Sequence, residues 1–532
     1  MWFTLTLICS AYVNLAVAAP SQPLLLPSTH YAVRDLERNS SLFVYQSAAS
    51  TDLTKCGYFN KTRGWTASWV QLTLPTNTSV HLEISLLNRK NNNAPREVRV
   101  LPPENADAVI AAGGSIIMTV RSTGQFYLEV DRQMDDRPLY LNHTNPDWNL
   151  PRVHTFHVFA DPVFDDVPNI SNSQFVRVVQ PGQVAPKDGF PESVLYFTPG
   201  THVLPGCEGG SGKVQPYTLQ SNKRYYLAEG AWVHGVLVGN DVANVTIDGA
   251  GVLVADQIRR PAPCDNGGVK GLEIKGKFYI TRNITIRGIT LADMPGHNMA
   301  LGGHDFDVSW VKIFSWRING DGVDGPGASG RRHALWLRDS FLRVQDDAMY
   351  MESGHRYERV RLWRDCNGKN FLFGGEVVGH SYPEFGTLVK DCDVLYDRMS
   401  YRNDKVIKAA AGIFSDKFLN TFQNLTVENV RVFDPNPYSS LIQIGNIPHR
   451  NGGPNLAKNQ RFVNLNFTNV HVTSLSYGNG INTALNVLRA TTSGSAIQIR
   501  MRNVTIAGRQ LKMTWGNTSV WDVEGRVEVV FD

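Results

Sequence analysis

Short apolar runs separated by polar turns fill this chain of 532 residues, and long helical patterns are nearly absent. The runs are rich in β-branched and aromatic residues, and Gly, Asn, Asp and Pro interrupt them. That combination is typical of an all-β protein. Between residues 28 and 175 the spacing of the runs and the turn residues predict a β-sandwich. Its expected strands are Ser41–Gln46, Trp65–Leu74, Val80–Leu87, Ile116–Val120, Gln125–Val130 and Thr155–Phe159.

A second pattern begins after a connector rich in Pro and Gly, Gln180–Pro191, which favours a domain boundary. Here one unit recurs at steps of roughly 24 to 40 residues: a short apolar strand, often opened by Asn, and then a polar turn. One such strand cannot bury its apolar face alone, but stacked coils bury a continuous core. The repeat therefore predicts a right-handed parallel β-helix, with a large sandwich or a propeller as the alternative. Examples are Asn244-Val-Thr-Ile, Asn283-Ile-Thr-Ile, Asn424-Leu-Thr-Val, Asn466-Phe-Thr-Asn and Asn503-Val-Thr-Ile.

Two acidic clusters fall beside strands of this repeat, about one coil apart. The first is Asn319-Gly-Asp-Gly-Val-Asp-Gly325, and the second contains the pair Asp346–Asp347. Equivalent positions on adjacent coils lie about 4.8 Å apart, so the carboxylates should converge on one open face. Carboxylates held close together have pKa values that are pushed apart, which leaves one as an acid and another as a base. Glycosidic bond cleavage needs that division, although a solvated edge with calcium-like carboxylates is the alternative.

The first residues of the chain indicate its compartment, and its hydropathy and net charge limit the classes of partner. Residues 1–18 read as a secretory signal with small residues before the cleavage point, although the lack of Lys or Arg leaves a signal anchor open. No later segment has eighteen consecutive apolar residues, so we expect no membrane partner. A net charge of +4 is nearly balanced and indicates no nucleic acid. We expect a secreted, extracellular monomer with a sandwich at 19–175 and a β-helix at 176–532.

Glycosylation signals and cysteines agree with secretion. Five cysteines remain after the signal, and we expect Cys207 to pair with Cys264, Cys366 to pair with Cys392, and Cys56 to stay free. No cysteine spacing resembles a zinc site. Asn-X-Ser/Thr signals, which suit a secreted glycoprotein, occur at Asn39, Asn60, Asn77, Asn142, Asn169, Asn244, Asn283, Asn424, Asn466, Asn503 and Asn517.

Several motifs together resemble glycoside hydrolase family 49, the dextranase and isopullulanase family, which shares a clan with the polygalacturonases. The most specific motif is Asp346-Asp-Ala-Met-Tyr-Met-Glu-Ser-Gly354, followed by Leu362-Trp-Arg-Asp-Cys-Asn-Gly368. The resemblance covers essentially the whole mature chain. Its other motifs are Ser41-Leu-Phe-Val-Tyr-Gln-Ser47, Ser193-Val-Leu-Tyr-Phe-Thr-Pro-Gly200, Tyr226-Leu-Ala-Glu-Gly-Ala-Trp-Val-His-Gly235 and Thr246-Ile-Asp-Gly-Ala-Gly-Val-Leu253.

The resemblance implies catalytic roles for three aspartates. Asp346 would be the general acid, and Asp321 and Asp347 would hold the attacking water of an inverting reaction. No metal and no cofactor is implied, because a carboxylate is sufficient to activate water. The gap of 346 − 321 = 25 residues is longer than the family usually shows, and it contains an insertion, Gly325–Arg332. Asp324 could therefore hold the water in place of Asp321.

Some residues instead resemble polygalacturonases, but incompletely. His380 lies 380 − 347 = 33 residues past the acidic pair, which is too far for a role in support of the acid. Val406-Ile-Lys408 resembles the Arg-Ile-Lys clamp of that family, but it lacks the arginine. Without that fork a uronate carboxylate loses bidentate binding, which argues against pectin.

Further residues are candidates for substrate binding, with packing inside the coils as the alternative. Trp316, Tyr350 and Trp363 could stack on sugar rings, while Asp324, Glu352 and Glu376 could accept hydrogen bonds from hydroxyls. His297 and His304 could line the cleft. The leading hypothesis is a secreted, inverting endo-glycosidase whose polysaccharide substrate is a neutral α-glucan, dextran or a pullulan-like chain. The alternatives are a polygalacturonase-like pectin hydrolase and a non-catalytic carbohydrate-binding β-helix.

Overall fold

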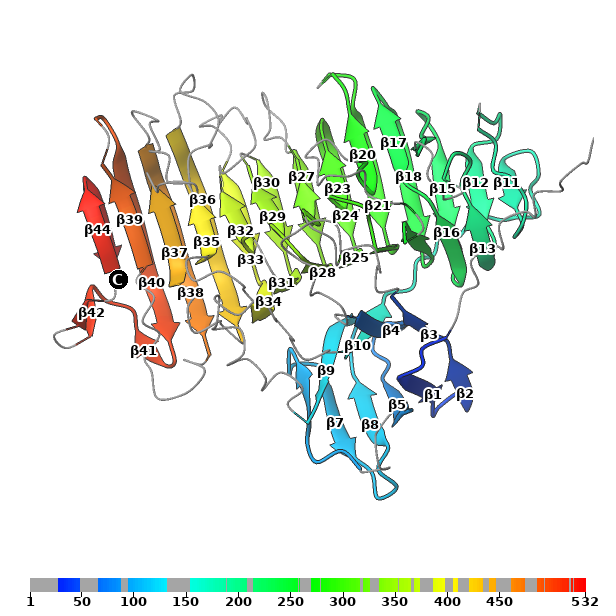
Figure 1. Ribbon diagram of the computed structural model, residues 1–532, viewed down its shortest axis with the longest axis horizontal. Coiled ribbons are helices and arrows are strands. Elements are labelled where there is room, and N and C mark those ends of the chain that lie inside the picture. Colours follow the sequence, from blue (N-terminus) through cyan, green and yellow to red (C-terminus); the bar gives the residue numbers. More distant parts are fainter. Residues whose placement is uncertain are drawn as a thin grey trace, which may run out of the picture.

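The protein is described by a computed structural model in which every described element is a strand (Figure 1). Within the described part of the chain, no helix is long and apolar enough to cross a membrane. The described residues are 27–47, 66–87, 94–131, 154–187, 189–207, 214–256, 258, 269–277, 279–315, 319–325, 334–352, 354–364, 368–373, 386–397, 405–409, 421–433, 440–445, 461–473, 486–491, 493–515, 518–519 and 521–532.

The first ten strands form two five-stranded sheets packed face to face. One sheet has the order β2-β1-β5-β8-β7 and the other β3-β4-β10-β9-β6. Alternating apolar residues from both sheets fill the space between them, as in β5, where every second side chain is buried. The bounds are β1 (Tyr31–Asp35), β2 (Ser40–Leu42), β3 (Val44–Gln46), β4 (Thr66–Thr73), β5 (Val80–Leu86), β6 (Val98–Leu101), β7 (Ala106–Ile110), β8 (Ile116–Val120), β9 (Gly124–Val130) and β10 (His154–Asp161).

The rest of the chain winds into coils of three strands, and strands of successive coils pair in parallel (Figure 1). We call the three faces sheet 1, sheet 2 and sheet 3. Sheet 1 contains β11 (Val176–Val179), β12 (Val194–Phe197), β15 (Arg224–Leu227), β18 (Ala243–Gly249), β21 (Arg282–Arg287), β24 (His304–Ser309), β27 (Leu335–Arg338), β30 (His355–Glu358) and β33 (Thr387–Lys390). Sheet 2 contains β13 (Gly200–Val203), β16 (Ala231–His234), β19 (Val252–Val254), β22 (Thr290–Ala292), β25 (Lys312–Phe314), β28 (Phe341–Val344), β31 (Arg361–Arg364) and β34 (Asp393–Asp397).

Towards the C-terminus, long strands run through both sheet 1 and sheet 2. These are β36 (Thr421–Val432), β38 (Arg461–Val472) and β40 (Ala496–Ile506), followed by β41 (Arg509–Gln510) and β45 (Val527–Phe531). Sheet 3 contains β14 (Tyr217–Thr218), β17 (Leu237–Asn240), β20 (Leu272–Lys275), β23 (Met299–Leu301), β26 (Val323–Asp324), β29 (Met349–Met351), β32 (Phe371–Phe373), β35 (Lys405–Ala409), β37 (Ser440–Gly445), β39 (Asn486–Ala490) and β44 (Trp521–Gly525), and the small hairpin β42 (Thr514–Trp515) and β43 (Thr518–Ser519) lies near the C-terminus. The predicted all-β class and parallel β-helix are confirmed.

Residues that recur in the repeated strand units stack on one another in successive coils. Inward residues of sheet 1 lie one above another through the coils and form a continuous apolar column: Ile247, Ile286, Val308, Leu337, Tyr357, Val389 and Val427. At the turns, asparagines with positive φ stack in the same way, and Asn283 donates to Asn244, which donates to Asn222, both at 2.8 Å. The stack explains why Asn opens the strand units at Asn244 and Asn283. Asn244 and Asn283 also belong to Asn-X-Thr signals, whose glycosylation stays a prediction.

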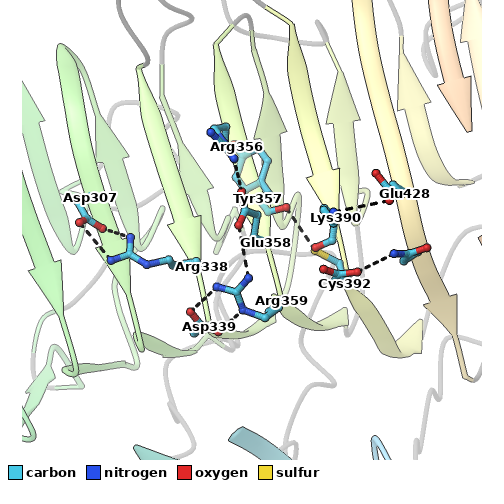
Figure 2. A network of polar contacts seen from close by, with 12 residues as sticks. Asp307, Arg338, Asp339, Arg356, Tyr357, Glu358, Arg359, Lys390, Cys392 and Glu428 are labelled. Atoms are coloured by element: carbon cyan, nitrogen blue, oxygen red, sulfur yellow. Dashed lines mark hydrogen bonds and ion pairs between the residues drawn. The ribbon is translucent and has the colours of Figure 1, made fainter. Parts of the chain in front are cut away.

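A ladder of alternating charges runs along the outside of sheet 1 (Figure 2). Arg338, Glu358, Lys390 and Glu428 occupy equivalent positions on four successive coils. Lys390 Nζ lies 3.7 Å from Glu428 Oε1, and the neighbouring Arg359 Nη1 lies 3.4 Å from Glu358 Oε2. Opposite charges directly across a strand pair stabilise it and like charges destabilise it. The alternation therefore favours one register between the coils.

The sandwich lies against the outer face of sheet 2 (Figure 1). Aromatic side chains of both parts form the seam between them. Trp69 stacks on Phe314 with ring centroids 4.7 Å apart, and Tyr127 meets Trp363 edge-on at 4.9 Å. A buried ion pair joins the two parts where Lys312 contacts Asp161; the same lysine also donates to the Gly288 carbonyl at 2.9 Å. This interface buries the outward side chains of sheet 2 that it contacts, so these are unavailable to a ligand.

The cysteine predictions have two outcomes. Cys392 is an unbridged thiol in the core, where it donates to the carbonyls of Lys390 and Tyr357, so the predicted Cys366–Cys392 bridge is wrong. Burial raises the pKa of this thiol to about 12. Cys56 and Cys264 lie outside the described residues, as do residues 1–18, so the Cys207–Cys264 bridge and the signal stay predictions.

Candidate active site

Three aspartates lie where adjacent turns enter sheet 3. Asp321 precedes β26, and Asp346 and Asp347 precede β29, the next strand of that sheet. Val323 pairs with Met349, and the Gly322 amide donates to the Asp347 carbonyl at 2.8 Å. Because the two strands are in register, the structure places Asp321 and Asp347 at equivalent positions on neighbouring coils.

Tyr350 connects the two carboxylates. Its hydroxyl donates to Asp321 Oδ2 and lies 3.5 Å from Asp347 Oδ2. Burial raises the pKa of the Asp321 carboxyl, and the nearby His297 charge and the Tyr350 hydroxyl lower it only in part. Both carboxylates therefore lie within 3.5 Å of one hydroxyl oxygen and face the same space.

Gly368 and Lys369 form the support of the acidic pair. The Lys369 amide donates to Asp347 Oδ1 at 2.5 Å, which fixes the orientation of that carboxyl. Gly368 has φ of 73°, and a Cβ atom there would lie 2.3 Å from the Asp347 amide nitrogen and 2.5 Å from Asp346 Oδ1. The turn therefore requires glycine for both conformation and space. The sequence Asn-Gly-Lys after the Leu362-Trp-Arg motif was the signal that could have found both residues.

Asp324 has a different surrounding. Its Oδ2 atom lies 3.2 Å from His297 Nδ1 and 3.8 Å from Lys270 Nζ, so two cations or donors face it. His297 Nε2 also lies 3.7 Å from Asp321 Oδ2. Asn298, fully buried beside His297, donates its side-chain amide to the Asp321 carbonyl at 2.7 Å. Lys270 and Asn298 were missed because they carry no motif and reach the aspartates only through the stacking of coils.

Two of the predicted sugar platforms are wrong. Trp363 is fully buried in the seam with the sandwich, where Arg343 also lies over its ring at 4.8 Å. Tyr350 is 3% exposed and offers a hydroxyl to the carboxylates rather than a ring face to a sugar. Both corrections have one cause: alternation along a strand places a side chain outward but does not tell what covers it.

Glu352 is buried at the end of β29, and burial raises the pKa of its carboxyl to about 8, to which the Asp324 charge adds. A largely protonated carboxyl is a hydrogen-bond donor as well as an acceptor. His304 lies at the start of β24 in sheet 1 and pairs with Asp305 at 2.7 Å. Trp316, Glu376 and His380 and the side chain of Lys408 lie outside the described residues.

The arrangement can support acid and base chemistry by carboxyl groups. Among the described residues, no group of three or more His, Cys, Asp and Glu side chains is arranged to hold a metal ion. Asp321, Asp346 and Asp347 instead lie at most 8% exposed and one coil apart, held by a phenol, a backbone amide and a glycine. Partial burial and neighbouring charges are the conditions under which carboxyl groups take distinct protonation states.

The fold and the site together define a parallel β-helix with a carboxylate cluster on sheet 3. No family model matches the chain. Over 266 residues, 45% of this chain and 38% of the relative, it is 22% identical to a dextranase of Arthrobacter sp. (strain CB-8). The aligned stretch thus spans well under half of that relative.

A solved structure matches over nearly the whole length. Dex49A from Penicillium minioluteum has 18% identity and a TM-score of 0.69, with 96% of each chain covered. This match shows a shared fold, and with the dextranase alignment it confirms the resemblance inferred from the motifs.

Proposed function

We propose that this protein is an inverting endo-glycoside hydrolase that cleaves a neutral α-glucan, dextran or a pullulan-like chain. The observation that carries the proposal is the Tyr350 hydroxyl, which brings the carboxylates of Asp321 and Asp347 together beside Asp346. The similarity to a dextranase and the fold of Dex49A support the same reaction class.

In this mechanism Asp346 protonates the glycosidic oxygen as the bond to the anomeric carbon breaks. Asp321 and Asp347 hold a water between them, and one of them takes its proton as the oxygen attacks from the opposite side. The Lys369 amide holds the Asp347 carboxyl in place by donating to its Oδ1 atom. Inversion requires about 6.5–9.5 Å between acid and base so that the water fits.

We further propose that the protein is secreted as a monomer. The expected signal at residues 1–18 and the glycosylation signals support secretion. A uronate substrate is disfavoured because valine stands at position 406, where an arginine fork would bind the carboxylate.

Release of reducing ends from dextran, pullulan and polygalacturonate tests the substrate class. We expect activity on one or both glucans and none on polygalacturonate; the reverse result would support a pectin hydrolase. Binding without turnover on all three would support a non-catalytic carbohydrate-binding protein. Proton NMR in the first minutes should show the β-anomer from an α-linked glucan, and initial accumulation of the α-anomer would exclude inversion.

A further inference from the structure

His297 lies between two aspartates that the sequence could not rank. It is part of the turn that enters β23, one coil before Asp321, and its ring is parallel to that of Tyr350, with centroids 6.5 Å apart. Nδ1 faces Asp324 Oδ2 at 3.2 Å, and Nε2 faces Asp321 Oδ2 at 3.7 Å. The ring thus spans the two carboxylates and contacts one with each nitrogen.

We propose that His297 is a positioning residue: paired with Asp324, it holds Asp321 in place as the water-holding carboxylate. This inference rests on the proposed function and assigns different tasks to the two aspartates. Nδ1 is within hydrogen-bond distance of Asp324, and Nε2 lies at ion-pair distance from Asp321, so a protonated ring interacts favourably with both carboxylates. The geometry therefore favours the imidazolium form.

The surrounding charges agree with that form. Burial alone would lower the pKa of His297, but the charges of Asp321 and Asp324 outweigh it and raise the pKa. Lys270, which lies just before β20, opposes them 3.8 Å from Asp324 Oδ2, and the uncharged Tyr350 ring faces the imidazole. Glu352 lies near enough to Asp324 for its own pKa to respond to that charge.

Asp324 and Asp321 differ in the groups that contact their carboxylates besides His297. Asp324 Oδ2 contacts both His297 and Lys270, so the task of this carboxylate is to bind these two side chains. Asp321 instead faces the Tyr350 hydroxyl and, across it, Asp347. The contacts thus favour Asp321 over Asp324 as the carboxylate that holds the water.

Two substitutions test the task of the ring. His297→Gln keeps a neutral donor near the Nε2 position, and His297→Asn keeps one near the Nδ1 position. Both remove the charge, so we expect kcat on the preferred glucan to fall about 10- to 100-fold with a smaller change in KM. The acid limb of kcat/KM should move to higher pH because the Asp321 pKa rises further without the cation. His81→Gln, which removes an exposed His–Glu pair on the sandwich, is the control. It should change neither kcat nor the pH profile of kcat/KM. An unchanged kcat and pH profile in both His297 variants would overturn the proposal.

A second measurement does not depend on turnover. NMR titration of the imidazole signals, with His297 assigned from the His297→Asn difference, should show a pKa above the ordinary range in the wild type. Asp324→Asn should lower it. An ordinary value in the wild type would refute the bridged ring. If the wild type cleaves none of the three polysaccharides but this titration is as expected, the proposed function fails while the bridge stands.

Discussion

Replacement of Gly368 by alanine tests whether the acidic pair depends on its close support. A Cβ atom at this position would lie 2.3 Å from the Asp347 amide nitrogen, whereas ordinary contact begins at 3.4 Å. The overlap is 3.4 − 2.3 = 1.1 Å. The contacted atoms include backbone, which cannot move aside by a side-chain rotation.

The loop that contains Gly368 cannot move away from the acidic pair without loss of hydrogen bonds. The Gly368 carbonyl accepts hydrogen bonds from Arg364 and from Lys369 Nζ, and Arg364 is fully buried and paired with Asp397. The acidic pair must therefore absorb most of the overlap. A displacement of about 1 Å at a reacting group can cost about 10²-fold in rate, and we expect kcat/KM of Gly368→Ala to fall by that order.

Gly508→Ala is the matched control. Gly508 has φ of 74°, against 73° at Gly368, but nothing lies within 4 Å of its added Cβ. Both variants pay about 1–2 kcal/mol for alanine in the left-handed region, and only Gly368→Ala meets the clash. Initial rates on the preferred glucan, measured well below the unfolding temperature of each variant, separate the two effects. Equal rates for Gly368→Ala and Gly508→Ala would refute the reasoning.

Three further predictions concern separate parts of the molecule. Asp346→Asn should lower turnover by about 10²–10⁴-fold and leave thermal unfolding nearly unchanged, because an amide cannot protonate the leaving oxygen; a near wild-type rate would remove Asp346 from that role. Trp363→Ala should lower the free energy of unfolding by about 3–5 kcal/mol in denaturant titrations without raising KM. A raised KM at unchanged stability would instead support the hypothesis that Trp363 stacks on a sugar. Glu352 has a pKa raised from 4.5 to about 8, so its stabilising contribution is full below pH 4.5 and is lost as pH rises towards 8. That contribution is at most about 5 kcal/mol, and unfolding of Glu352→Gln should depend less on pH over this window; an identical pH dependence in both proteins would contradict the buried acid.

Local pattern alone was sufficient for the architecture. The strand unit opened by Asn repeats because the turn asparagine has positive φ and bonds to its counterpart one coil away, and the apolar residues after it form the stacked column. Both signals are visible in the sequence because the apolar column runs through successive coils and the asparagines recur on several of them. The position of Asp346–Asp347 beside a strand followed from the same periodicity.

Sequence alone placed Asp321 one coil from the pair, but the tasks of its neighbours depended on contacts between coils. Tyr350 and Trp363 look alike in the sequence, since each is an aromatic residue in a short strand. Stacking of the coils places Tyr350 against Asp321, whereas the docked sandwich buries Trp363. Gly368 and His297 show the same limit, because each acts on a residue of a neighbouring coil. Alternation along a strand determines which side chains face outward, but only the tertiary structure decides what each of them meets there.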